Sequence, residues 1–172
     1  RRSLMELQAD LLPLLTSAGW HSDWQFDVPT HIPNDHPAFN VLGRFGGLHI
    51  NPDTDSGVEC ATADVDIRPL EHRWPTVDCW ESRLATTLVG FALASDTYAQ
   101  LWIASDSRVF ASNDITEYVG YVGDGFNAAM HNMLTGVRHR PLLAPGETGI
   151  NYYGENYHAG DPRIYNWQPS VG

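Results

Sequence analysis

A chain of 172 residues has the length of one ordinary domain, with or without an appendage, and is short for two. Its 21 acidic and 10 basic residues give a formal net charge of −11, and all ten basic residues are arginines. Direct binding to nucleic acid is disfavoured because the phosphate backbone requires a basic surface, so basic surfaces are the favoured partners. With 42% hydrophobic residues the chain can form a core, which excludes disorder along its whole length.

The sequence shows no sign of membrane insertion or export. No apolar run approaches the roughly 20 residues that cross a bilayer, and the chain does not open with the pattern of a signal peptide. We therefore expect residence in the cytoplasm and no membrane partner. Cys60 and Cys79 are too few for a disulfide scaffold or a four-thiolate zinc site, so we expect two reduced, buried thiols.

The first predicted element is a helix over residues 3–18, where leucines recur every three or four positions. Pro13 lies inside this pattern and lacks an amide hydrogen, which predicts a kink or two short helices. Gly19 ends the helix. Residues 21–34 contain two prolines and mixed polarity, which is typical of a loop.

A second helix is predicted over residues 35–45. Asn34 or Asp35 supplies the expected N-cap, and Pro37 suits the first turn because it needs no hydrogen-bond acceptor there. A pair of glycines ends this helix. The pattern therefore predicts a short helix followed directly by a change of chain direction.

The middle of the chain carries the predicted strands. Apolar runs and alternating patterns predict strands at 48–50, 58–67, 88–93, 101–104 and 108–111. The 58–67 pattern slips by one residue near Thr62, as at a β-bulge. The last two strands are separated by a short Ser-Asp-Ser turn, which predicts a hairpin. Residues 71–81 mix charges with Trp74 and Trp80 and are expected to form a loop.

A last helix is predicted from Phe126 to Leu134, with Asp124 as its N-cap and Gly136 after its end. Helices at both ends with strands between them favour one α+β domain, with a mostly antiparallel sheet flanked by N- and C-terminal helices. We place this domain at residues 1–136. Residues 137–172 are an aromatic, Pro- and Gly-rich tail without helical or strand periodicity, expected either to lie over its own domain or else to contact another chain or stay mobile.

The most charged stretch contains five carboxylates within fourteen residues: Asp53, Asp55, Glu59, Asp64 and Asp66. In a strand, side chains two residues apart share a face, so Asp64 and Asp66 repel each other unless a cation meets them. Three interpretations remain open here. The stretch is a solvated sheet edge, a docking face for a basic protein, or a pair of groups for metal binding or acid–base chemistry.

Known catalytic patterns are missing from the sequence. There is no Gly-x-Ser-x-Gly turn, phosphate-binding loop, dinucleotide-binding turn or zinc-deaminase motif. The eight histidines lack the spacing of a helical metal pair, so we expect no catalytic residue, metal or cofactor. Exposed tryptophans near charges are common at interfaces, and Trp74 and Trp80 are therefore candidates for partner contact, although a loop tryptophan more often packs on its own loop.

Several short motifs occur in a specific order: Gly-Trp after the first helix, Phe-Gly-Gly-Leu after the second, Asp-Ser-Arg-Val-Phe in the hairpin, and Gly-Asp-Gly-Phe before the last helix. Over residues 4 to 136 this order resembles the SUKH superfamily of immunity proteins, specifically its third subfamily. The matching structural landmarks are Gly19, Trp20, Phe45, Gly46, Gly47, Leu48, Phe126 and Gly136.

The resemblance implies a non-enzymatic α+β protein of bacteria that binds and blocks a cognate polymorphic toxin. An acidic domain suits a toxin whose cleft is basic enough to hold nucleic acid or a nucleotide. We expect Asp53 to Asp66, with Trp74 and Trp80, to form the toxin-facing surface. Two alternatives stay open: a scaffold of the same fold that binds a protein other than a toxin, and a small metal-dependent hydrolase or nuclease that uses the carboxylates.

Overall fold

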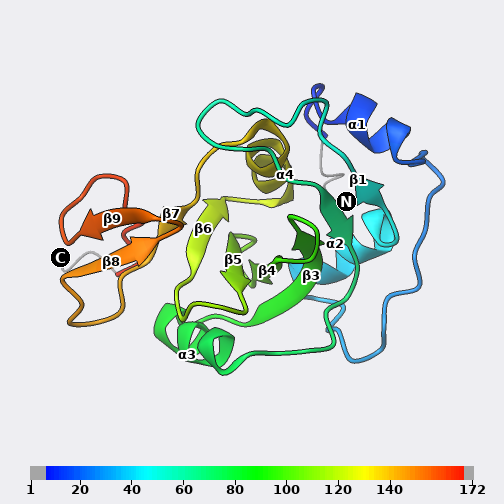
Figure 1. The fold of residues 1–172 in the computed structure, drawn as a ribbon. Helices are drawn as coiled ribbons and strands as arrows, with labels where there is room; N and C mark the ends of the chain where they lie inside the picture. The colour runs from blue at the N-terminus through cyan, green and yellow to red at the C-terminus, as the bar shows by residue number, and fades with distance from the viewer. Residues whose placement is uncertain (1–6, 169–172) are drawn as a thin grey trace.

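The computed structural model describes residues 7–168 (Figure 1). Within this range there are four helices, α1 (Leu12–Ser17), α2 (Pro37–Phe45), α3 (Pro75–Leu84) and α4 (Phe126–Thr135). Seven strands form one sheet: β1 (His49–Ile50), β2 (Val65–Ile67), β3 (Leu88–Ala94), β4 (Ala99–Ala104), β5 (Val109–Asn113), β6 (Gly120–Gly123) and β7 (Arg140–Pro141). A separate hairpin consists of β8 (Gly149–Tyr152) and β9 (Glu155–His158).

The large sheet follows the chain from one edge to the other. Its strands lie in the order β1 to β7, and each pairs with its neighbours in antiparallel fashion. The predicted hairpin is confirmed as β4 and β5, with Trp102 opposite Phe110. The predicted fold class, a single α+β domain with a mostly antiparallel sheet, is therefore confirmed.

The two faces of the sheet are covered by different elements. Leu101 and Ile103 of β4 belong to the core cluster formed with α1, α2 and α4, whereas Trp102 belongs to a second cluster that includes α3. This division follows from the alternation of side chains along a strand. In the first cluster Phe45 stacks on Phe126 with ring centroids 4.6 Å apart, which joins α2 to α4.

The sharp turn after α2 depends on its two glycines. A Cβ on Gly46 would overlap the ring of Phe26, and Gly47 has φ +86°, where side chains are disfavoured. Beside this turn the indole of Trp20 donates to the carbonyl oxygen of Arg44 at 3.1 Å. These landmark residues therefore fix the entry of the chain into the sheet.

Some predicted helix ends are wrong. The first helix begins only at Leu12, which leaves Pro13 in its first turn, where the missing amide costs no helical hydrogen bond. Residues 3–6 of the predicted helix lie outside the described residues. His36 caps α2, because its Nδ1 accepts from the amide of Ala38, and Gly125 caps α4. The sequence predicted Asn34 or Asp35 and Asp124 at these positions.

The predicted strand over residues 58–67 is also wrong, because only Val65–Ile67 are in a strand. The preceding residues form a loop that docks on the C-terminal end of α4. The amides of Glu59 and Cys60 donate to the carbonyl oxygen of Gly136 at 2.9 Å, and the amide of Ala63 donates to Met133 at 3.0 Å. Hydrogen bonds to a helix end thus replace the expected strand pairing.

The segment after Gly136 contains strands that its sequence did not predict. β7 extends the large sheet and β8 pairs with β9. Farther along, Tyr165 stacks on Tyr121 at 4.1 Å, and the ring of Trp167 lies 5.4 Å from that of Trp80. The described part of the segment therefore lies on the sheet, as the first of its two interpretations predicted.

Candidate functional site

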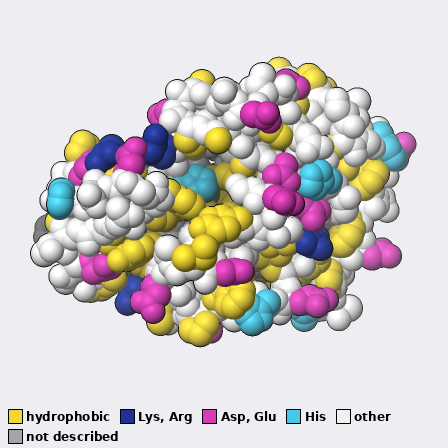
Figure 2. Space-filling view, in the orientation of Figure 1, with side chains coloured by type: hydrophobic (Ala, Val, Ile, Leu, Met, Phe, Trp, Pro, Cys, Tyr) yellow, Lys and Arg dark blue, Asp and Glu magenta, His cyan; other side chains and the backbone are white. Residues whose placement is uncertain are grey.

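The carboxylates of the acidic stretch lie on a loop and at the start of a strand. Asp53 and Asp55 are exposed on the loop between β1 and β2, Asp64 precedes β2, and Asp66 lies in its middle. We call these four residues the acidic edge. Figure 2 shows acidic and histidine side chains gathered right of centre, with a basic side chain beside them, over the β1 and β2 end of the sheet.

Asp64 and Asp66 each have a side-chain partner within the chain. Asp64 lies 3.4 Å from His49 Nε2 and also accepts the backbone amide of Asp96 at 3.0 Å. Asp66 pairs with Arg68 at 3.2 Å. Because both pairs are open to solvent, each contributes little to stability. The repulsion expected between Asp64 and Asp66 is therefore reduced by the chain's own side chains.

Glu59 has a different set of partners. Its carboxylate accepts the backbone amide of Arg138 at 2.7 Å, and Arg138 Nη2 donates to the carbonyl oxygen of Glu59 at 3.1 Å. The structure therefore does not bring Glu59 together with Asp64 and Asp66. It places this carboxylate where it holds the loop against the segment that follows α4.

The two candidate tryptophans differ in exposure because the predicted loop at 71–81 is wrong. Its second half is α3, where Val77, Trp80 and Leu84 share the face that packs on the sheet. Trp80 is only 1% exposed and packs against the sheet and Trp167, so in this structure it presents no surface to a partner. Trp74 is half-buried at the N-cap of α3, with its ring 3.9 Å from that of His72.

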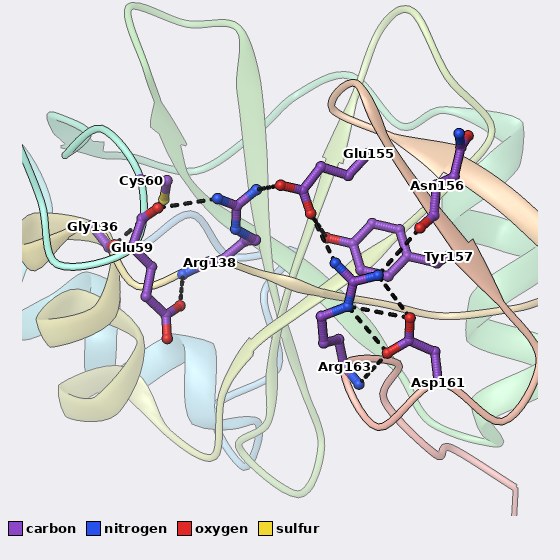
Figure 3. Close-up of polar contacts among 9 residues, drawn as sticks. All are labelled: Glu59, Cys60, Gly136, Arg138, Glu155, Asn156, Tyr157, Asp161 and Arg163. Carbon is purple, nitrogen blue, oxygen red and sulfur yellow. Dashed lines mark hydrogen bonds and ion pairs between the residues drawn. The ribbon is translucent and has the colours of Figure 1, made fainter.

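Sequence reasoning missed an arginine and carboxylate network that ties the hairpin to the sheet (Figure 3). Glu155 on β9 accepts from Arg138 Nη1 at 2.6 Å and from Arg163 Nη1 at 3.0 Å. Arg163 also pairs with Asp161 and lies 4.3 Å from the ring centroid of Tyr157. The only sequence signal was the cluster of arginines after Gly136, without any indication of their partners.

A cavity of about 250 Å³ lies between the docked loop, the end of α4 and the hairpin. Its wall includes four tyrosines, Tyr98, Tyr152, Tyr153 and Tyr157, together with His139 and Cys60. Burial lowers the pKa of His139 to about 4, and its Nε2 lies 3.0 Å from Met133 Sδ. The cavity therefore holds an uncharged imidazole at neutral pH.

Cys60 is not an activated nucleophile. Burial is the main cause of the raised pKa of Cys60, so its thiol stays protonated at neutral pH. Its Sγ lies 3.4 Å from the carbonyl oxygen of Gly136. The prediction that both cysteines are buried is wrong, because Cys60 is half-buried and Cys79 on α3 is exposed.

Residues 7–168 contain neither a metal-binding cluster nor a membrane-spanning helix. No group of three or more His, Cys, Asp or Glu side chains in this range is placed to hold a metal ion. No helix in the same range has the length and apolar character needed to cross a membrane. The polar networks described above join segments of the chain to one another and converge on no reactive group.

The fold is a single α+β domain in which ion pairs such as that of Arg138 with Glu155 join segments of the chain to one another. The model of the SUKH-3 immunity protein family matches residues 8–136, and the chain belongs to this family. No curated protein and no solved structure matches it. The family is typically non-enzymatic, and membership implies that the chain neutralises a cognate toxin by binding it.

Proposed function

We propose that this immunity protein acts in the bacterial cytoplasm and blocks a toxin whose substrate is nucleic acid or a nucleotide. An enzyme that holds phosphate groups presents arginines and lysines in its cleft, and those charges attract an acidic partner. The four residues of the acidic edge, together with Trp74 at the N-cap of α3, are proposed to face that cleft. Glu59 is proposed to support this surface from behind, through its contacts with Arg138.

The observation that carries the proposal is that several arginines form ion pairs with carboxylates of the same chain. Arg73 pairs with two carboxylates of α3, Arg108 with Asp106, and both Arg138 and Arg163 with Glu155. These four arginines therefore pair with carboxylates of the chain itself. By contrast, Asp53 and Asp55 are exposed and take part in no ion pair among the described residues. A partner therefore meets a surface on which negative charge predominates.

Charge of this kind acts mainly on the rate of encounter. Complementary fields raise association rates by about 10- to 1,000-fold at low salt, and the gain falls as salt screens the charges. An inhibitor that protects its own cell benefits from rapid association. The proposal therefore predicts that toxin binding slows steeply with ionic strength, whereas dissociation changes much less.

The test uses the toxin domain encoded next to this protein. Cells that co-express both proteins should survive, and an inactivated toxin domain should bind the purified protein. The variant Asp53→Arg/Asp55→Arg should slow association about tenfold or more, and Asp64→Arg/Asp66→Arg should do the same. The control Asp23→Arg/Asp27→Arg makes the same charge change on exposed residues of the 21–34 loop.

Two outcomes would count against the proposal. Cells that die despite expression of the folded protein would refute neutralisation of that toxin. Equal association rates for the acidic-edge variants and the control would remove this surface from the mechanism, and circular dichroism of each variant establishes that it is folded.

A further inference from the structure

The second face of the large sheet is only partly covered. The cluster on this face joins α3 and residues of the C-terminal segment to Leu88, Trp102 and Phe110. Toward the other end of the strands, Leu93 and Gln100 instead form the floor of an open groove of about 450 Å³. Residues 68–74 form one wall of this groove, and Thr97 and Asp114 lie at its opposite end.

A buried hydrogen-bond relay fixes the position of one carboxylate in this groove. The indole of Trp102 donates to Ser112 Oγ at 2.8 Å, and Ser112 Oγ donates to Gln100 Oε1 at 3.1 Å. Gln100, which is 5% exposed, donates through Nε2 to Asp114 Oδ1 at 2.6 Å. Asp114 itself is exposed, and its second oxygen has no hydrogen-bond donor among the described residues. The relay thus holds a carboxylate ready to accept one more hydrogen bond.

The groove carries two carboxylates and one arginine, and its wall contains the indole of Trp74, with the ring of His72 against it. Glu71 and Asp114 line it and form no ion pair with any described residue, while the charge of Arg68 is already shared with Asp66. Trp74 lines the same groove. A planar guanidinium stacks on an indole face while its N–H groups donate to carboxylates, and it is less strongly hydrated than an ammonium group.

We infer that this groove receives an arginine side chain from a basic segment of the toxin, with Trp74 as its stacking surface and Glu71 and Asp114 as its acceptors. The inference rests on the proposed function and specifies the chemistry of the contact. It extends the binding surface from the acidic edge, across Asp66 and Arg68, onto the uncovered part of the sheet. The occupant is a cationic side chain of a protein.

Two conservative variants test the groove against the inactivated toxin domain encoded beside this protein. Asp114→Asn removes the charge but keeps an oxygen for Gln100, and Trp74→Leu removes the aromatic face but keeps apolar volume. We expect the dissociation constant to rise about tenfold for Asp114→Asn and about tenfold or more for Trp74→Leu. The control Asp23→Asn, which loses the same charge at an exposed position, should stay within about twofold of the wild type.

Hydrogen exchange of the complex gives a second readout that does not depend on a variant. Residues 68–74 and 112–116 should exchange more slowly in the complex if the groove is filled. Unprotected segments, together with Asp114→Asn and Trp74→Leu binding as tightly as the control, would overturn the inference and leave the proposed function standing. A wild-type protein that fails to bind the toxin would instead refute the proposed function.

The free protein provides a last discriminating measurement. Sedimentation over a range of concentrations should show no dimer that depends on Asp114. A dimer abolished by Asp114→Asn would overturn the inference, because a second copy of this chain would then be the occupant of the groove.

Discussion

His139 makes a quantitative prediction about stability and pH. The residue lies beneath the hairpin, with its Cβ close to Gly120 of β6 and its ring nitrogen Nε2 in contact with Met133. Burial lowers its pKa from 6.5 to about 4, because a charged imidazole loses its hydration there. In the unfolded chain the same side chain takes up a proton at its ordinary value. Between these two pKa values the unfolded state therefore binds more protons than the folded state.

The sign and size of the effect follow from that difference. Stability must fall as pH falls through 6.5 and must stop falling from this source below about 4, where both states are protonated. Each pH unit in this window lowers the free energy of unfolding by at most about 1.4 kcal/mol. Between about pH 7 and pH 4.5 the loss is about 2 to 3 kcal/mol. This value is an upper bound, since part of the ring faces the cavity.

Urea unfolding at both pH values measures the effect. His139→Leu keeps apolar volume without a titrating group, so the wild type should lose about 2 to 3 kcal/mol more than this variant over the same pH range. Protonation of the other groups is common to both proteins and cancels in the comparison. His31→Leu, on an exposed loop, controls for the removal of a histidine as such. Equal losses in the wild type and His139→Leu would refute the reasoning.

Three further predictions concern the docked loop and the hairpin. Gly136→Ala should lower the free energy of unfolding, measured in urea, by about 2 kcal/mol or more, because Gly136 has φ +72° and a Cβ would overlap the loop backbone. The control Gly146→Ala, at φ +82° with open space around it, should lower it by only about 1 kcal/mol. Equal losses for the two variants would disprove the clash. Iodoacetamide at neutral pH should modify Cys79 faster than Cys60, as peptide mass spectrometry will show, and equal rates would contradict the burial of Cys60. Arg163→Met should speed proteolysis within β8 and β9 while the rest of the chain stays resistant, because the variant loses the ion pairs with Glu155 and Asp161. Added salt should also speed cleavage of the wild-type hairpin, since it screens these pairs. Unchanged cleavage would mean that the ion pairs of Arg163 do not hold the hairpin.

Elements defined by local signals were predicted from the sequence. The apolar positions of α4 recur with helical spacing, and Gly136 follows them in the left-handed conformation that commonly ends a helix. The β4 and β5 hairpin has two apolar strands and a short polar turn. In both cases the residues that decide the structure are neighbours in sequence, so their pattern is sufficient.

Other elements depend on contacts that a linear pattern does not contain. Residues 58–63 alternate like a strand, yet Gly57 lies against Gly136 so closely that the loop docks on α4 instead. α3 was missed because its apolar face consists of Val77, Trp80 and Leu84 among charged residues. Proline at its start and the spacing of these three residues were the available signal.

The candidate site could be predicted only in part, because charge density along the chain does not reveal which charged side chains are paired with one another in the fold. Glu59 and Asp66 belong to one acidic stretch, but the first holds Arg138 and the second pairs with Arg68. Asp114 is far from that stretch in sequence, and only the register of β3, β4 and β5 brings it to the same groove as Trp74. The carboxylates available to a partner are those without an ion pair inside the chain, and the fold decides which carboxylates these are.

The exclusive use of arginine as the basic residue fits this division of charge. Arg44 lies 5.8 Å from the ring centroid of Trp20, Arg83 lies 4.8 Å from that of Trp80, and Arg163 packs on a tyrosine while donating to carboxylates. These contacts use the planar face and the several N–H groups of guanidinium, which an ammonium group cannot reproduce. These described arginines therefore contact aromatic and acidic side chains of the chain itself, and the carboxylates without an ion pair among the described residues are the ones available to a basic partner.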